Sequence, residues 1–198
     1  MEKPAQPDYP ILDVLERRWS PRAFAAKAVE PEKLRSIFEA VRWSASSYNE
    51  QPWVFFVARR QETELFEKIL GCLVEGNRLW ARQAPVLGLT ATKTFFERNH
   101  EPNRVHQHDL GLAMGSLTAQ AMALDLFVHQ MAGLVPARVR AEFDLPEGCE
   151  PQTGFAIGYG GDPEQLPASL RDSELAPRTR KKQDEFVFGP RFGESATF

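Results

Sequence analysis

Arginine side chains near the two ends of the chain are the residues best suited to hold a charged ligand. Arg18 and Arg22 flank Ser20 near the start, and Arg178 and Arg180 lie near the end. A guanidinium group holds phosphate oxygens in a bidentate fork and stays charged at any relevant pH, so together these residues would suit a phosphate group. Taken singly, each is an ordinary solvated charge at a helix end or in a basic run.

Polar and small residues occur at three further places between these arginines. The loop Ser46 to Trp53 leads directly into the apolar run Val54 to Ala58. Asn77 offers both a donor and an acceptor. In Met131-Ala132-Gly133, a small residue followed by glycine would let the main chain approach a ligand closely. A double serine alone most often marks a turn, so it is the joint order of the segments that favours a ligand site.

Five segments in this order closely resemble the FMN-dependent nitroreductase family, and they cover nearly the whole chain. They are Arg18-Trp19-Ser20-Pro21-Arg22, Ser46 to Trp53, Asn77, Met131-Ala132-Gly133-Leu134, and Arg178 with Arg180. The resemblance implies one bound FMN per site. The cofactor-binding residues that it implies are Arg18, Trp19, Ser20, Arg22, Ser46, Ser47, Asn49, Asn77, Met131, Ala132, Gly133, Arg178 and Arg180.

The resemblance also implies a role for each segment. Arg18, Arg178 and Arg180 would hold the FMN phosphate, with Ser20 adding a hydroxyl. Arg22 would lie at the N1/O2 side of the ring and stabilise the negative charge that collects there on reduction. Asn77 would bind the pyrimidine edge, and the main chain of residues 131–133 would face N5. The loop holding Ser46, Ser47 and Asn49 would come from the second subunit, which implies an obligate homodimer.

The residues that would contact a substrate are less well defined. Phe95 and Phe96 lie where the family places a variable segment that covers the substrate, although a core role is also open for them. His106 and His108 are two residues apart and would point to different sides of a helix, so no metal site is predicted. No side chain is predicted to act as a catalytic nucleophile or acid, because the flavin carries the chemistry.

Composition bounds the class of protein and its partners. The chain has 198 residues, of which 42% are hydrophobic, so one domain over residues 1–198 is expected. A net charge of −3 and a pI near 5.9 argue against nucleic acid as a partner. The charged, proline-containing start and the lack of a long apolar run predict a cytoplasmic protein that does not enter a membrane. Cys72 and Cys149 offer no metal or disulfide pattern.

Hydrophobic periodicity places helices and strands in alternation. Helices are expected at about residues 8–18, from Pro31, and at 61–70, 77–83, 108–124 and 137–143; strands are expected at 53–58, 85–92, 127–130 and 154–159. This order indicates an α+β fold with helices on both faces of a sheet. The resemblance refines it to a three-layer α/β/α sandwich around a small mixed, mostly antiparallel sheet. We expect residues 162–198 to form an extended tail that packs on the partner subunit.

The predicted function is that of an FMN-dependent oxidoreductase. It would take a hydride from NADH or NADPH and pass it to a nitroaromatic compound, a quinone or another electron-poor acceptor, in a ping-pong cycle. The nucleotide would be a visiting co-substrate, since no Gly-x-Gly-x-x-Gly follows a strand. Two alternatives stay open: reduction of a conjugated carbonyl or other small metabolite on the same fold, and a non-catalytic flavin-binding protein.

Overall fold

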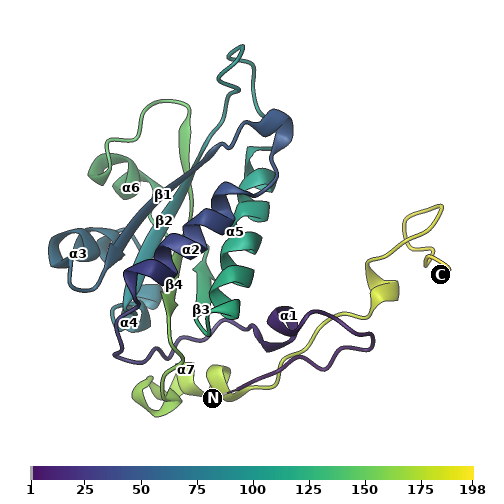
Figure 1. Cartoon of the computed structure of the whole chain (residues 1–198), viewed down its shortest axis with the longest axis horizontal. Helices are drawn as coiled ribbons and strands as arrows, with labels where there is room; N and C mark the ends of the chain where they lie inside the picture. The colour runs from purple at the N-terminus through teal and green to yellow at the C-terminus, as the bar shows by residue number, and fades with distance from the viewer. Residues whose placement is uncertain (1) are drawn as a thin grey trace.

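The computed structural model describes residues 2–198, and its centre is an open four-stranded sheet. The strand order is β1-β2-β4-β3, and all pairings between these strands are antiparallel. Helices cover both faces of the sheet (Figure 1), which confirms the α+β class and the three layers. The strands are β1 (Trp53–Arg59), β2 (Val86–Lys93), β3 (Phe127–Met131) and β4 (Cys149–Gly158).

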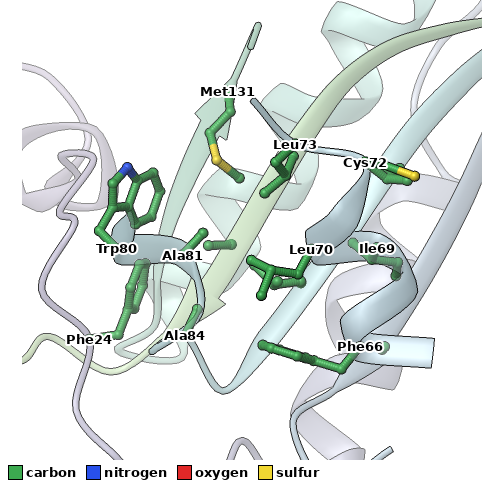
Figure 2. Close-up of a cluster of buried hydrophobic side chains, with 14 of the residues drawn as sticks. Phe24, Phe66, Ile69, Leu70, Cys72, Leu73, Trp80, Ala81, Ala84 and Met131 are labelled. Carbon is green, nitrogen blue, oxygen red and sulfur yellow. The ribbon is translucent and has the colours of Figure 1, made fainter. Parts of the chain in front are cut away.

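Two hydrophobic cores lie on opposite faces of the sheet. On one face, α2 (Pro31–Arg42) and α5 (His106–Ala123) bury Ile37 and Leu117 against Phe155 of β4. The other face carries α3 (Thr63–Gly71), α4 (Glu75–Ala81) and α6 (Pro136–Glu142), with Trp80 and Phe24 stacked near its centre (Figure 2). Because β2 lies between both cores, every residue from Val86 to Thr92 is buried.

Local sequence explains several of these elements. Proline at the first position of α2 fits the fixed φ of that site, and Leu34, Ile37 and Val41 then recur every three or four residues on the buried face. Gly88 in β2 is required by close packing, since a Cβ there would fall 2.1 Å from the ring of Phe155. The predicted helix from Pro31 and the strands at 53–58, 85–92 and 127–130 are therefore confirmed within one or two residues.

The first predicted helix is too long. Helix α1 spans only Asp13–Arg17, whereas residues 8–18 were expected. The residue before a proline is disfavoured in the helical conformation, so Pro10 opposes helix at Tyr9. Ile11 and Leu12, which the periodicity places on a buried face, are exposed in the single chain, Leu12 by 70%. Without a buried face the segment has little reason to form a helix.

Strand β4 begins at Cys149, five residues before the predicted start. The sequence Glu150-Pro151-Gln152 is typical of a loop, yet it pairs with the end of β2. Pro151 is tolerated because it lies at a register shift between Thr90 and Ala91, where a ladder hydrogen bond is already absent.

The tail also departs from a purely extended segment. It contains α7 (Ala168–Leu175), which packs against the body, and then runs beside the N-terminal segment away from the sheet (Figure 1). Arg178 joins the two segments by donating hydrogen bonds to the carbonyls of Lys3 and Glu16, at 2.6 and 2.9 Å. Beyond this point Phe192 and Phe198 are 93% and 96% exposed. No helix within residues 2–198 has the length and apolar character needed to cross a membrane.

Candidate functional site

Arg18, which follows α1, lies near Arg178 and Arg180 of the tail, about 160 residues later in the sequence. Arg18 is partly buried, and its pKa is lowered by burial first and then by the positive charges of Arg178 and Arg180. The pKa of Arg178 is also lowered, by burial and by Arg180. Within residues 2–198, these three guanidinium groups have no carboxylate partner within 4 Å. We call Arg18, Arg178 and Arg180 the arginine site; it is a cluster of positive charge that an anion would stabilise.

Two buried polar atoms beside the arginine site lack a hydrogen-bond partner in the described chain. They are Nε of Arg18 and Nε1 of Trp19. Both are donors, and leaving a buried donor unpaired costs about 1–3 kcal/mol. Ser20 lies within reach of the same guanidinium, with Arg18 Nη2 3.3 Å from its Oγ. The arrangement offers positive charge next to a serine hydroxyl, which is the chemistry that a phosphate ester requires, while Arg178 also donates to the carbonyls of Lys3 and Glu16.

Glu174 of α7 fixes the main chain next to the arginine site, and the sequence analysis did not identify it. Its carboxylate accepts the backbone N–H groups of Arg22 and Ala23, at 2.8 and 3.0 Å, and the residue is only 1% exposed. Lys3 donates to the Glu174 carbonyl at 2.6 Å and lies 4.8 Å from the ring of Trp19. The tail thus holds the segment from Arg18 to Arg22 in place.

His129 of β3 supports the same segment from the other side. Its pKa is lowered from 6.5 to about 4, chiefly by burial; the charge of Arg22 also lowers it, and hydrogen bonds from its ring to the main chain of Pro21 and Ser20 act in the opposite direction. The neutral ring donates from Nδ1 to the carbonyl of Pro21 at 3.0 Å and packs on Trp80 at 4.5 Å. His129 was also missed, because a single histidine in a strand carries no signal of its partners.

Asn77 and Gly133 are brought into contact from opposite sides of one core. The side-chain amide of Asn77 donates to the Gly133 carbonyl at 2.9 Å. Gly133 has no room for a side chain, since a Cβ would lie 2.7 Å from both Asn77 Nδ2 and Val74. Met131 ends β3 and is buried, so β3 carries both His129 and the start of this turn. The pairing joins two of the predicted segments and leaves the amide oxygen of Asn77 as an acceptor.

The loop Ser46–Gln51, which we call the serine loop, lies at the other end of α5. Ser47 N–H donates to the buried carboxylate of Asp109 at 3.0 Å, in the first turn of that helix. Tyr48, Asn49 and Gln51 have φ values of 53°, 56° and 50°, in the left-handed region that non-glycine residues rarely adopt. Such strain persists where the surrounding structure imposes it, often at a ligand site.

Helix α5 separates the serine loop from the arginine site within one chain. Arg17 contacts Asp125, just after the end of α5, at 2.5 Å, while the serine loop is attached to Asp109 at its start. The helix between Asp109 and Ala123 is about 21 Å long, from the rise of 1.5 Å per residue. The two regions lie at opposite ends of the molecule in Figure 1. One chain therefore does not bring all the predicted residues together.

The predicted substrate residues lie next to the serine loop. The ring of Phe96 meets that of Tyr48 edge to face at 5.9 Å, and Phe95 pairs with Pro102 across a short hairpin. Both residues border a hollow of about 480 Å³ that also includes Pro146 and Gly148. Phe95 is 45% exposed, which does not fit the core role left open for it.

Comparison with known proteins gives this arrangement a context. The sequence profile of the nitroreductase family matches residues 15–159, which include Arg18 to Arg22, the serine loop, Asn77 and the turn at Gly133. The chain belongs to the nitroreductase family. Arg178 and Arg180 lie in the tail, beyond the matched residues.

Individual relatives support the family membership. A solved oxidoreductase described as containing FMN is 33% identical, covers 96% of each chain and superposes with a TM-score of 0.89. The major NAD(P)H-flavin oxidoreductase of Aliivibrio fischeri is 25% identical over 90% of this chain and 98% of its own. A nitroreductase family protein from Clostridium difficile, 23% identical with a TM-score of 0.72 over 93% and 100% of the two chains, shares the fold.

Proposed function

We propose that the chain is a homodimeric FMN-dependent oxidoreductase that uses NADH or NADPH to reduce nitroaromatic compounds, quinones or related electron-poor acceptors in a ping-pong cycle. The observation that carries the proposal is the arginine site, where three guanidinium groups meet without a carboxylate. Repulsion between them is a cost to the folded chain that a bound phosphate dianion would offset. The relatives that act on or contain flavin agree with this assignment.

The residues present fit FMN. Arg18, Arg178, Arg180 and Ser20 would hold its phosphate, whose negative charge would offset the repulsion between the three guanidinium groups. Asn77 would use its amide oxygen for a ring N–H, since its amide nitrogen already donates to Gly133. When bound, FMN supplies the capacity to accept and release a hydride.

The protein's own contribution would be positioning, charge and exclusion of water. Glu174 holds the main chain of Arg22, so the guanidinium is presented from a fixed segment. A fixed cation next to the pyrimidine edge would stabilise the negative charge of the reduced state and raise the reduction potential. A Cβ at Gly133 would meet Asn77 and Val74, so glycine lets the turn at residues 131–133 pack directly on these two side chains.

The length of α5 supports the proposed dimer. Ser46, Ser47 and Asn49 would complete the flavin site of the neighbouring subunit, because the length of α5 keeps them away from the arginine site of their own chain. The single domain of residues 1–198 would send the end of its tail, residues 162–198, across the partner from beyond Arg180, because α7 and Arg178 contact their own chain. The exposed aromatic residues Phe186, Phe192 and Phe198, with Leu12, provide apolar surface for that contact.

Absorption spectroscopy of the purified protein tests the proposal. We expect a bound flavin spectrum that bleaches on anaerobic addition of NADH or NADPH and returns on addition of a quinone. Sedimentation monitored at the flavin band should find the colour in a dimer. A bound flavin that neither nucleotide bleaches would indicate a flavin-binding protein without turnover, and a protein that takes up no FMN would overturn the assignment.

A further inference from the structure

Tyr48 is the aromatic residue of the serine loop, and its side chain is exposed. It stands between Ser47 and Asn49, has a φ of 53° and is 77% exposed. A bulky residue rarely adopts the left-handed conformation. Because the ring of Tyr48 is exposed, burial of the ring does not compensate for this backbone strain. The edge-to-face contact with Phe96, at 5.9 Å, orients this ring.

Arg98 covers the same two rings. Its guanidinium carbon lies 4.5 Å from the ring centre of Tyr48 and 5.3 Å from that of Phe96. Attraction between a cation and an aromatic face restricts a side chain that would otherwise sample many rotamers. The positive charge therefore has a defined place, above the ring of a residue inside the serine loop.

The charges around Arg98 leave its own charge unpaired. Lys93 and Glu97 of the same hairpin pair with each other. Glu50 turns its carboxylate to the main-chain N–H of Glu97, at 2.7 Å. In the part of the chain that the structure describes, no carboxylate lies within 4 Å of Arg98. A negatively charged ligand would find here a cation that no protein group neutralises.

The hairpin that carries Arg98 is attached to the serine loop. Lys93 N–H donates to the Pro52 carbonyl at 2.8 Å, and the Glu97 contact with Glu50 adds a second link. The hollow of about 480 Å³ beside Phe95 and Phe96 is large enough for a single substituted ring. Phe96 borders both the hollow and the stack with Tyr48 and Arg98, whereas Arg98 itself does not line the hollow.

We infer that Arg98, held by Tyr48 and Phe96, selects aromatic electron acceptors that carry a negative charge, such as nitroaromatic carboxylates. The inference rests on the proposed function, because only the assignment of Ser47 and Asn49 to a flavin site puts Tyr48 next to the reacting ring. The acceptor reaction is ArNO₂ + NAD(P)H + H⁺ → ArNO + NAD(P)⁺ + H₂O, and Arg98 contributes binding and not proton transfer.

A matched pair of acceptors tests the inference. 4-Nitrobenzoate and 4-nitrobenzamide have similar shape and differ in charge. The FMN-loaded dimer, reduced with dithionite and free of nucleotide, would be mixed with each acceptor in a stopped-flow instrument, so that binding of the anionic NAD(P)H does not enter. The variants are Arg98→Gln and Tyr48→Leu. Arg104→Gln is the control, since Arg104 is exposed on the same connection and stacks on neither ring.

We expect Arg98→Gln to lower the second-order rate constant for 4-nitrobenzoate three- to tenfold and to change that for 4-nitrobenzamide less than twofold. We define the charge preference as the ratio of the rate constants for 4-nitrobenzoate and 4-nitrobenzamide. Tyr48→Leu should lower this ratio in part, and Arg104→Gln should leave it unchanged. Higher salt should reduce the preference of the unmodified protein. Equal losses for both acceptors, no loss for either, or the same change in Arg104→Gln would overturn the inference. Failure of both 4-nitrobenzamide and a quinone to reoxidise the reduced flavin of the unmodified protein would instead contradict the proposed function.

Discussion

Contacts between distant parts of the sequence hold the arginine site, whereas mostly local hydrogen bonds hold the serine loop. Glu174 reaches the main chain of Arg22, and Arg178 reaches Lys3. In the serine loop, Asn49 and Gln51 bond to the main chain and hydroxyl of Ser46, while Asp109 and the main-chain N–H of Glu97 supply its long-range hydrogen bonds. The arginine site is therefore fixed by the folded chain, while the serine loop keeps backbone strain and exposed side chains.

This difference suggests a division of work between the two regions. A charged phosphate needs donors that are already in place, because any movement of the arginines would cost binding energy. In the proposed function the serine loop would border the acceptor, and its strained residues are exposed. Four experiments test this difference between the arginine site and the serine loop.

The largest effect is expected at Glu174. Glu174→Ala removes a buried carboxylate and leaves the N–H groups of Arg22 and Ala23 unpaired, so the free energy of unfolding should fall by about 3 kcal/mol. Urea unfolding of the flavin-free protein, at matched concentration, measures this loss. Asp172→Ala, at an exposed position of α7, should cost less than about 0.5 kcal/mol. Equal stability of the two variants would show that the tail does not fix the arginine site.

A second effect should appear with pH at His129. Its pKa is about 4 in the folded chain and about 6.5 in the unfolded one, so between these values only the unfolded chain takes up a proton. Stability should therefore fall by about 2–3 kcal/mol between pH 6.5 and pH 4 from this residue alone. His129→Asn, whose amide nitrogen takes the place of Nδ1 and can still donate to Pro21, should lose less stability over the same range. Parallel pH profiles for the two proteins would contradict the buried neutral ring.

FMN affinity should depend on the arginines of the site. Arg18→Ala or Arg180→Ala removes a charge-assisted contact to the phosphate and should weaken FMN binding by about 1.5–3 kcal/mol. Quenching of flavin fluorescence on binding gives the dissociation constants. Arg35→Ala on the exposed side of α2 is the matched control. Unchanged affinity in both site variants would remove the phosphate assignment.

The smallest effect concerns strain in the serine loop. Gln51 has a φ of 50°, which asparagine tolerates better than glutamine. Gln51→Asn should therefore raise the free energy of unfolding by about 0.5 kcal/mol. Gln51→Ala should lower the free energy of unfolding, because alanine loses the side-chain hydrogen bond to Asn49 and adopts a positive φ no more easily than glutamine. A lower free energy of unfolding in Gln51→Asn would mean that the backbone at residue 51 is not under strain.

Much of the fold could be predicted from local patterns. Leu34, Ile37 and Val41 repeat at helical spacing, and β2 is a short apolar run, so each element follows from its own residues. The cooperating segments of the site could also be found, because their order resembles a known family. These are features that a single stretch of sequence carries.

Features that depend on distant partners could not be predicted. Glu174 lies among Asp172, Ser173 and Leu175 in a polar segment, and only its contact with Arg22, about 150 residues earlier, makes it buried. Pro151 argues against a strand until the register shift opposite it is known. Ile11 and Leu12 have the spacing of a helix but no core of their own to cover. In each case the deciding contact is long-range.

The length of α5 has a genetic consequence. If each flavin site takes its arginines from one chain and its serine loop from the other, two different loss-of-function alleles can complement. A subunit with Arg18→Ala and a subunit with a damaged serine loop would assemble into a mixed dimer in which one site collects both defects. The opposite site would then receive an intact half from each subunit. Co-expression of two inactive variants should thus restore up to half of the activity per mixed dimer, which a site built within one chain could not do.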